Sequence, residues 1–280
     1  MSGAVVVGVD GSRSAGSALA WAADDAARRK LPLRIVHVRE PWRAEHPLTA
    51  ASPQTTRTEQ WTHLLQEAAD QARSQVLGLD VSTALVTGAV VERLVSESET
   101  ADTVVLGSRG RGGFTGLVLG SVGLGLAGRA HCPVVYVRRP AGEGGEIVVG
   151  YDGSADSESA LEYAMAQASA RGARARVVHG RQLAPLATEP ASAGAIPVGD
   201  FRQLLVAWRE KYPDVEVTES VVRGHPVPVL VEASLTAELV VVGSRGVGGF
   251  ASAVLGSVSH GVLHRARCPV AVVRAPWRRA

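Results

Sequence analysis

The chain has 280 residues, of which 46% are hydrophobic, 20% charged and 4% aromatic, and its formal net charge is +2. At about 150 residues per domain this length predicts two domains, and the composition excludes a disordered chain. The balance of charge argues against non-specific nucleic-acid binding, which depends on a concentrated basic surface.

Short Val-rich runs alternate with helical patterns along the first half of the chain. The runs have the length and composition of buried strands, and the patterns between them repeat at the spacing of one helix face. The predicted strands are 4–9, 33–38, 81–86, 103–107 and 133–137, and the predicted helices are 14–29, 61–76, 89–99 and the segment after Gly120-Ser121.

The second half repeats the first. Val5–Ser12 recurs as Ile147–Ser154, displaced by 142 residues, and Thr103–Val122 recurs as Leu239–Val258, displaced by 136 and identical at fourteen of twenty positions. The second copy is therefore six residues shorter between its second and third strands. We expect a tandem duplication with domains 1–140 and 145–280, joined by a hinge at 140–145.

Strands that alternate with helices predict an α/β fold: two tandem, doubly wound, Rossmann-like domains, each with a five-stranded parallel sheet. In such sheets ligands bind outside the carboxyl ends of the strands, where the strand order reverses. The first strand ends at Gly8 and Asp10. The fourth ends at Gly107, followed by Ser108, Arg109 and Gly110, and nine residues later by Gly120 and Ser121. Copy two has the same spacing from Gly243 to Ser257.

Glycines at this edge predict a phosphate cradle, because main-chain amides at a helix N-terminus can approach an anion closely. The segment is neither a P-loop nor a GxGxxG turn, and neither lysine of the chain lies near it. Blander interpretations stay open: the loops are connections, Asp10 caps a helix, and Arg109 and Arg245 are solvated. His37 and His179 fit strand ends with satisfied hydrogen bonds. His260 and His264 lack the Glu of an HExxH metal site.

Asp10 together with Gly107-x2-Gly110-x9-Gly120-Ser121 resembles the nucleotide motif of the universal stress protein family, in its ATP-binding branch. The resemblance covers essentially the whole chain. It implies strand order 3-2-1-4-5, ATP between strands one and four, adenosine beside Asp10 and the main chain of Val38, and ribose and phosphates on the glycine loop. One departure is Gly123, where the family has the Ser or Thr seen at Ser259. The implied ATP-binding residues are Gly8, Asp10, Val38, Gly107, Ser108, Arg109, Gly110, Gly112, Gly113, Gly120, Ser121 and Val122 in copy one, and Gly150, Asp152, Gly180, Gly243, Ser244, Arg245, Gly246, Gly248, Gly249, Gly256, Ser257, Val258 and Ser259 in copy two.

The resemblance implies a regulator of stress response or growth that binds ATP as an occupancy signal. An ATP-dependent adenylyl or phosphoryl transferase, or a weak ATPase, is the alternative, and a scaffold that binds nothing is a third. We expect no catalytic residues and no metal ligands in the chain, and leave open whether Mg²⁺ accompanies the nucleotide. We also expect Gly107→Ala and Gly243→Ala each to weaken binding at their own site without unfolding the chain.

The remaining expectations concern partners and location. Strand five of each copy, 133–137 and 269–273, is an edge that predicts pairing of the two domains within the chain, with a homodimer also open. Two cysteines, Cys132 and Cys268, are too few for a disulfide framework and are expected to be small buried hydrophobes. Met1–Ser12 lacks the features of a signal peptide, and the uncharged stretch Gly112–Gly128 is too short to cross a bilayer, so we expect a cytoplasmic protein without membrane or nucleic-acid partners.

Overall fold

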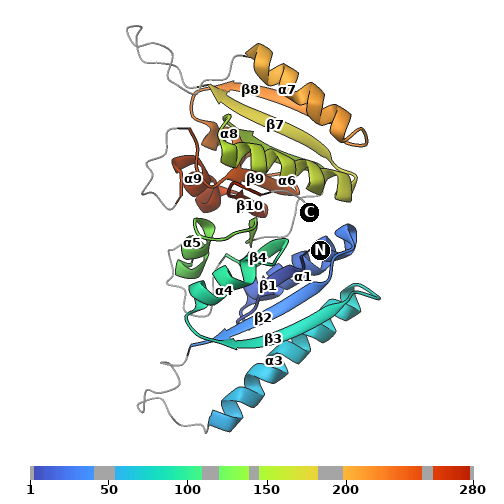
Figure 1. Cartoon of the computed structure of the whole chain (residues 1–280), viewed down its shortest axis with the longest axis vertical. Helices are drawn as coiled ribbons and strands as arrows, with labels where there is room; N and C mark the ends of the chain where they lie inside the picture. Colours follow the sequence, from blue (N-terminus) through green and yellow to red (C-terminus); the bar gives the residue numbers. More distant parts are fainter. Residues whose placement is uncertain are drawn as a thin grey trace. The chain divides into compact units, whose positions relative to one another are not determined.

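The computed structural model describes residues 3–40, 54–108, 120–138, 145–181, 198–247 and 255–277. Contacts divide the chain into two compact units, unit 1 with Met1–Arg138 and unit 2 with Arg139–Arg279 (Figure 1). Of the predicted hinge, only Gly145 lies among the described residues.

Unit 1 is a parallel five-stranded sheet with the strand order β3-β2-β1-β4-β5. This order confirms the predicted doubly wound α/β class. Each predicted strand and helix appears, with bounds shifted by a few residues at most except for α3, which starts earlier. In chain order the elements are β1 (Val5–Gly8), α1 (Arg13–Arg29), β2 (Leu33–Arg39), α3 (Gln54–Gln75), β3 (Val81–Thr87), α4 (Val90–Ser98), β4 (Thr103–Gly107), α5 (Ser121–Ala127) and β5 (Val134–Val137).

Unit 2 repeats this architecture, with the parallel order β8-β7-β6-β9-β10. The length difference between the copies falls between their second and third strands, as the sequence displacement predicts. The helix in that connection is also shorter, with 14 residues in α7 and 22 in α3. The elements are β6 (Glu146–Tyr151), α6 (Ala155–Arg171), β7 (Arg174–Arg181), α7 (Val198–Lys211), β8 (Val217–Arg223), α8 (Pro226–Ala233), β9 (Leu239–Gly243), α9 (Ser257–Arg265) and β10 (Val270–Val273).

Helices cover both faces of each sheet, which explains why the strands are apolar throughout. In unit 1, α1 packs beside α3 and against β1 and β4, while α4 packs beside α5. Val7, Val105 and Val135 in the central strands have no exposed surface. The face of α1 toward the sheet is built from alanines such as Ala18 and Ala22, also fully buried. Such small side chains bring the helix backbone close to the strands.

The strand register places the functional ends together. Gly8 at the end of β1 pairs with Val36 of β2 and with Leu106 of β4. The segments that follow β1, β2 and β4 therefore leave the sheet at one edge. In unit 2 the main chain after β6, β7 and β9 leaves the sheet in the same way.

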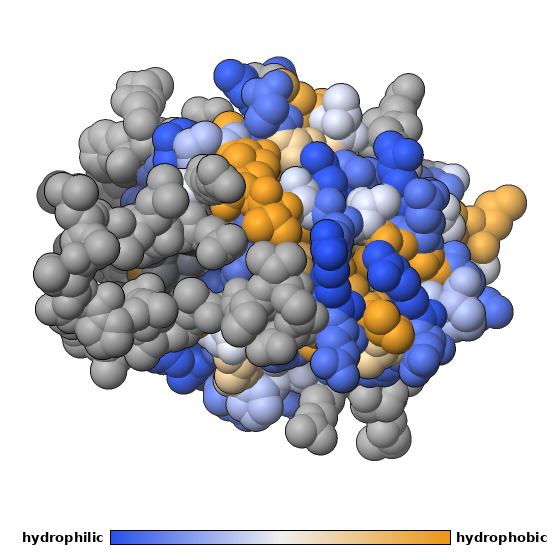
Figure 2. Space-filling model, turned by 90° about the horizontal axis from the view of Figure 1, so that it is seen from above, coloured by the Kyte–Doolittle hydropathy of each residue, from blue (hydrophilic) through white to orange (hydrophobic). Residues whose placement is uncertain are grey.

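The described helices are not of the membrane-spanning kind. Among residues the structure describes, no helix is long and apolar enough to cross a membrane. Figure 2 shows hydrophobic side chains on the described part of one face as small separate patches between hydrophilic ones. The large exposed hydrophobics are likewise scattered through the described elements and turns: Leu77, Val206, Val221, Leu235 and Val247.

Candidate functional site

The turn from β1 into α1 is built around Asp10. Its Oδ1 accepts a hydrogen bond of 2.9 Å from the main-chain N–H of Ser12. Ser12, rather than Asp10, is the N-cap of α1, and its hydroxyl oxygen accepts from the N–H of Ala15 at 3.2 Å. Gly11 takes a φ of +77°, which L side chains rarely adopt. The simple interpretation of Asp10 as a helix cap is therefore wrong: Asp10 shapes the turn and Ser12 caps.

Asp152 repeats this turn in unit 2 and adds a link to the glycine loop. Its Oδ1 accepts from the N–H and the hydroxyl of Ser154, at 3.0 and 2.6 Å. Its Oδ2 accepts from the N–H of Val247 at 3.1 Å. The structure thus joins the end of β6 to the segment after β9, two places that the sequence separates by about ninety residues. A Cβ on Gly246 would clash with Asp152 Oδ2, so a larger residue there would force this carboxylate to move.

The loop after the fourth strand returns to its own beginning in both units. The N–H of Gly120 donates to the carbonyl of Ser108 at 3.0 Å, and the N–H of Gly256 donates to the carbonyl of Ser244 at 2.8 Å. Each of these glycines is the N-cap of the next helix and supplies no capping side chain. Unlike the first turn of α1, the first turns of α5 and α9 therefore receive no hydrogen bond from an N-cap side chain.

Part of the predicted site lies outside the described residues, namely Arg109, Gly110, Gly112, Gly113, Gly248 and Gly249. The structure brings the described members of the motif, on β1, β4 and α5 and on their unit 2 counterparts, to one sheet edge in each unit.

Gly107 and Gly243 are glycines because a helix backbone lies against them. A Cβ on Gly107 would lie 2.6 Å from the carbonyl carbon of Ser14 and 2.9 Å from the nitrogen of Ala15, both in the first turn of α1. At Gly243 the closest atoms, in Asp156 and Ser157, would be 3.0 Å away. Because a Cβ at Gly107 would meet rigid main chain, alanine there is expected to destabilise unit 1. That the chain still folds stays a prediction.

Ser259 fastens the loop of unit 2. Its hydroxyl donates to the carbonyls of Ser244 and Gly256 at 2.9 and 3.0 Å, and the residue is 1% exposed. Unit 1 has Gly123 at this position, and there the carbonyl of Gly123 accepts from the hydroxyl of Tyr136 at 2.8 Å. The departure from the family pattern therefore removes a side-chain hydrogen bond at the helix head.

The ends of β2 and β7 each carry a buried histidine under an aromatic ring. His37 Nδ1 lies 2.7 Å from the carbonyl of Val9, and its ring stacks on Trp61 of α3 at 4.4 Å. In unit 2, His179 Nδ1 lies 3.0 Å from the carbonyl of Tyr151, with its ring on Phe201. The prediction of strand-end histidines with satisfied hydrogen bonds is confirmed at Nδ1 of both rings. It is wrong for Nε2 of His179, which is buried and has no hydrogen-bond partner among the described residues. Val38 and Gly180 follow these histidines, one strand away from Asp10 and Asp152.

Asp156 is a buried site residue that sequence reasoning missed. Its Oδ2 accepts from the hydroxyl of Ser244 at 2.6 Å and from the N–H of Arg245 at 3.0 Å. Its Oδ1 accepts from the N–H of Ala275 at 2.9 Å, and Arg245 Nε lies 3.9 Å from Oδ2. The signal was present in the repeat: the displacement of 142 aligns Asp156 with Ser14.

Neither cysteine has the environment of a reactive thiol. Cys132 and Cys268 are free and 4% and 2% exposed. Burial raises the pKa of the Cys132 thiol far above its usual range and that of Cys268 to about 12. The thiols therefore stay protonated at neutral pH, which fits their predicted role as buried hydrophobes.

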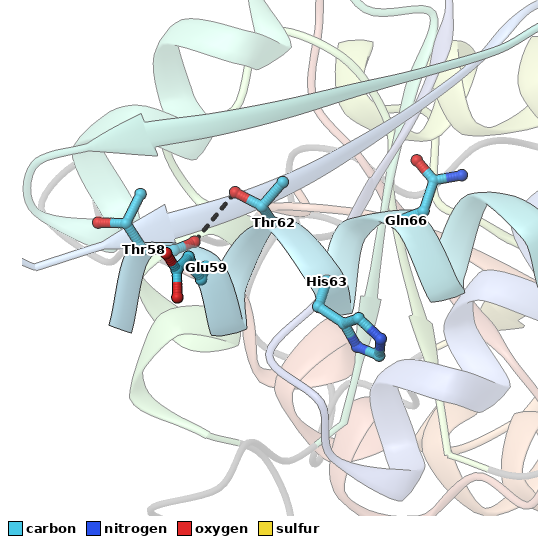
Figure 3. Close-up of a pocket in the computed structure, with 5 residues that line it drawn as sticks. All are labelled: Thr58, Glu59, Thr62, His63 and Gln66. Carbon is cyan, nitrogen blue, oxygen red and sulfur yellow. Dashed lines mark hydrogen bonds between the residues drawn. The ribbon is translucent and has the colours of Figure 1, made fainter. Parts of the chain in front are cut away.

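Other clusters in the described parts of the chain offer no alternative centre. His260 and His264 are in ring contact at 4.3 Å, but no group of three potential metal ligands occurs among the described residues. A hollow drawn in Figure 3 is lined by Thr58, Glu59, Thr62, His63 and Gln66, all on α3. The hydroxyl of Thr62 donates to the carbonyl of Thr58 at 2.9 Å, and His63 pairs with Glu67 at 3.4 Å. Both contacts lie within α3, so this hollow is part of a solvent-exposed helix surface and not a binding site.

The family was tested by comparison with known proteins. The family model described as "Universal stress protein family" matches residues 1–138 and again 145–274. Universal stress proteins Rv2005c and Rv2623 of Mycobacterium tuberculosis (strain H37Rv) are 38% and 36% identical to the chain, over 96% of both sequences in each case. A universal stress protein from Archaeoglobus fulgidus has a similar fold, with a TM-score of 0.74 and 22% identity over 97% of this chain and 98% of that one. The chain therefore belongs to the universal stress protein family and contains two tandem copies of its domain.

Proposed function

We propose that each unit binds ATP at the carboxyl edge of its sheet, and that occupancy of these sites regulates a stress or growth response. The glycine spacing, its repetition in both units and the membership of the universal stress protein family support this function. The nucleotide would lie across the ends of β1 and β4 in unit 1 and of β6 and β9 in unit 2, where the strand order reverses.

One observation carries the proposal. In both units a glycine at the head of a helix donates its N–H to the residue directly after the fourth strand, Gly120 to Ser108 and Gly256 to Ser244. This hydrogen bond holds the first turn of α5 or α9 beside the strand ends. In neither helix does an N-cap side chain accept a hydrogen bond from that turn. Main-chain N–H groups without a side-chain acceptor suit the oxygen atoms of phosphates. Among the described residues, a Cβ on Gly120 would meet only the carbonyl oxygen of Ser108, at 4.0 Å, so the described part of the chain leaves space beside this turn.

The other predicted contacts follow from the position of each residue. The Gly8–Asp10 segment and the main chain of Val38 border the adenosine end. Ser121 and Val122 offer main-chain N–H groups and a hydroxyl to the phosphates. In unit 2 the same places belong to Asp152, Gly180, Ser257 and Val258. We expect main-chain groups near Val38 and Gly180 to read the edge of adenine, so GTP should bind more weakly than ATP.

We further propose that ATP is held and not turned over at an enzymatic rate. Hydrolysis needs an oriented water and compensation of charge on the γ-phosphoryl oxygens. The carboxylate oxygens of Asp152 and Asp156 already accept hydrogen bonds from the protein, and His37 and His179 are buried with Nδ1 bonded to main-chain oxygen. These four side chains are already engaged by the protein, which argues against a role for them as general base.

Titration calorimetry with ATP tests the binding proposal. We expect saturable binding, with up to two ATP per chain, and weaker binding of GTP. Gly120→Val fills the open space at the head of α5 and should remove the unit 1 site. Gly16→Val is the matched control, since a Cβ at Gly16 in α1 has no neighbour within 4 Å among the described residues outside its own helix turn. Absence of saturable ATP binding, or equal loss in both variants, would contradict the proposal.

A steady-state phosphate-release assay on nucleotide-free protein tests the second proposal. We expect turnover well below the usual enzyme range of about 1–10³ per second. Rates within that range that disappear in the double variant Arg109→Ala plus Arg245→Ala would place the protein among the ATPases.

A further inference from the structure

The first turns of the two equivalent helices differ in charge. In α1 the first turn contains Arg13 and no acidic residue, whereas in α6 it contains Asp156 and Glu158 and no basic one. These turns start directly after the predicted adenosine residues Asp10 and Asp152, and each packs against the glycine that ends the fourth strand. Unit 2 therefore has two carboxylates in a turn where unit 1 has none, and Arg13 of the unit 1 turn is exposed.

Asp156 is held close to the segment on which the phosphates would lie. Its carboxylate accepts the N–H and hydroxyl donors of Arg245 and Ser244, at 3.0 and 2.6 Å, and both residues belong to the predicted phosphate loop. The residue is 7% exposed, so water screens its charge poorly. Nε of Arg245 lies 3.9 Å from Oδ2 of Asp156. The positive charge of Arg245 is therefore partly neutralised by this carboxylate.

Glu158 adds a second carboxylate to this turn. It accepts a hydrogen bond from the Tyr151 hydroxyl at the end of β6. Burial raises the pKa of Tyr151, which keeps the hydroxyl protonated and the pair fixed. In unit 1 the displacement of 142 places Val9 and Gly16 at these two positions, and neither carries a charge.

We propose that Asp156 makes the two sites unequal: unit 1 binds ATP tightly, and unit 2 binds the same adenine nucleotide more weakly because its cradle already contains a carboxylate. The inference rests on the proposed function and concerns the relative affinity of the two sites for ATP. A carboxylate about 6 Å from a phosphate charge reduces affinity by roughly tenfold at an effective dielectric constant of about 40. The chain would then respond to ATP over two concentration ranges.

The test exchanges the residues of the two copies. In wild-type protein, calorimetry should resolve one tight and one weaker ATP site, and Gly120→Val should remove the tight one. Added to Gly120→Val, Asp156→Ser should strengthen the remaining site about tenfold, and the reciprocal Ser14→Asp in an otherwise unchanged chain should weaken the tight site by a similar factor. Adenosine, which has no phosphate, should bind each variant as it binds its parent.

The outcomes separate this inference from the function on which it rests. If neither site binds ATP, the proposed function fails. If both sites bind ATP equally, if Gly120→Val removes the weaker site, or if the exchanges leave ATP affinity unchanged, the proposed function stands and the role of Asp156 is refuted. Equal changes for ATP and adenosine would show an effect of packing and also refute it. If Asp156→Ser unfolds at the temperature of the titration, Asp156→Asn and Ser14→Asp still test whether the carboxylate changes ATP affinity.

Discussion

Replacement of Gly107 by alanine is expected to destabilise unit 1 before it affects any ligand. The new Cβ would lie 2.6 Å from Ser14 C, 2.7 Å from Ser14 O and 2.9 Å from Ala15 N. All three atoms are main chain in the first turn of a packed helix, so none can move aside as a flexible side chain would. Overpacking of this kind costs about 1–3 kcal/mol, and each kcal/mol lowers the melting temperature by roughly 2–8 °C in domains of this size.

Two other glycines provide a graded series. A Cβ on Gly243 would have its nearest neighbours at 3.0 Å, one of them a side-chain atom. Among the described residues, a Cβ on Gly120 would meet a single atom, at 4.0 Å. Gly243→Ala should therefore cost less than Gly107→Ala, and Gly120→Ala should leave the free energy of unfolding unchanged. Urea unfolding and thermal melting of the three variants without nucleotide measure the order. A Gly107→Ala protein that unfolds like wild type would refute the claim that this glycine permits close approach of α1.

The remaining predictions concern buried charge and buried sulfur. Arg29 is 8% exposed and pairs with Asp25 at 3.2 Å and with Asp102, so Arg29→Ala should lower the free energy of unfolding by about 3–5 kcal/mol. Arg28 pairs with Asp24 on the exposed side of the same helix, so Arg28→Ala should lower it by at most about 1 kcal/mol. Similar urea midpoints for the two variants would contradict this. Because burial raises the thiol pKa of Cys132 and Cys268, neither should react with a thiol-specific reagent at pH 8 until the protein is unfolded, and rapid labelling of the native protein would show the reverse.

Much of the fold was predictable because the two halves of the sequence are copies of one domain and can be aligned with each other. Strands buried on both faces need continuous apolar runs, and such runs recur at constant displacement in both copies. The structure confirms the order implied by the family resemblance in both units. Element ends were less predictable: α3 begins at Gln54, ahead of the apolar face that starts at Trp61.

The position of the candidate loop was predictable from the glycine spacing, but its contacts were not. Glycine spacing located the loop, yet the reason for Gly107 lies in Ser14, which is distant in sequence and reaches it only through the packing of α1 on β4. Asp156 was overlooked because an acidic residue in a first helix turn is ordinary in sequence. Its role at the candidate site depends on the hydrogen bonds that its carboxylate accepts from N–H and hydroxyl groups distant in sequence, and these contacts are visible only in the three-dimensional structure.

Native mass spectrometry of the nucleotide-free chain, incubated with ATP and transferred under gentle conditions, tests the central claim most directly. The account predicts mass increments of first one and then two ATP molecules per chain as the ATP concentration rises, with the first increment absent at low ATP in Gly120→Val and retained in Gly16→Val. A wild-type chain that gains no ATP, or wild-type and Gly120→Val spectra that coincide at every ATP concentration, would contradict it.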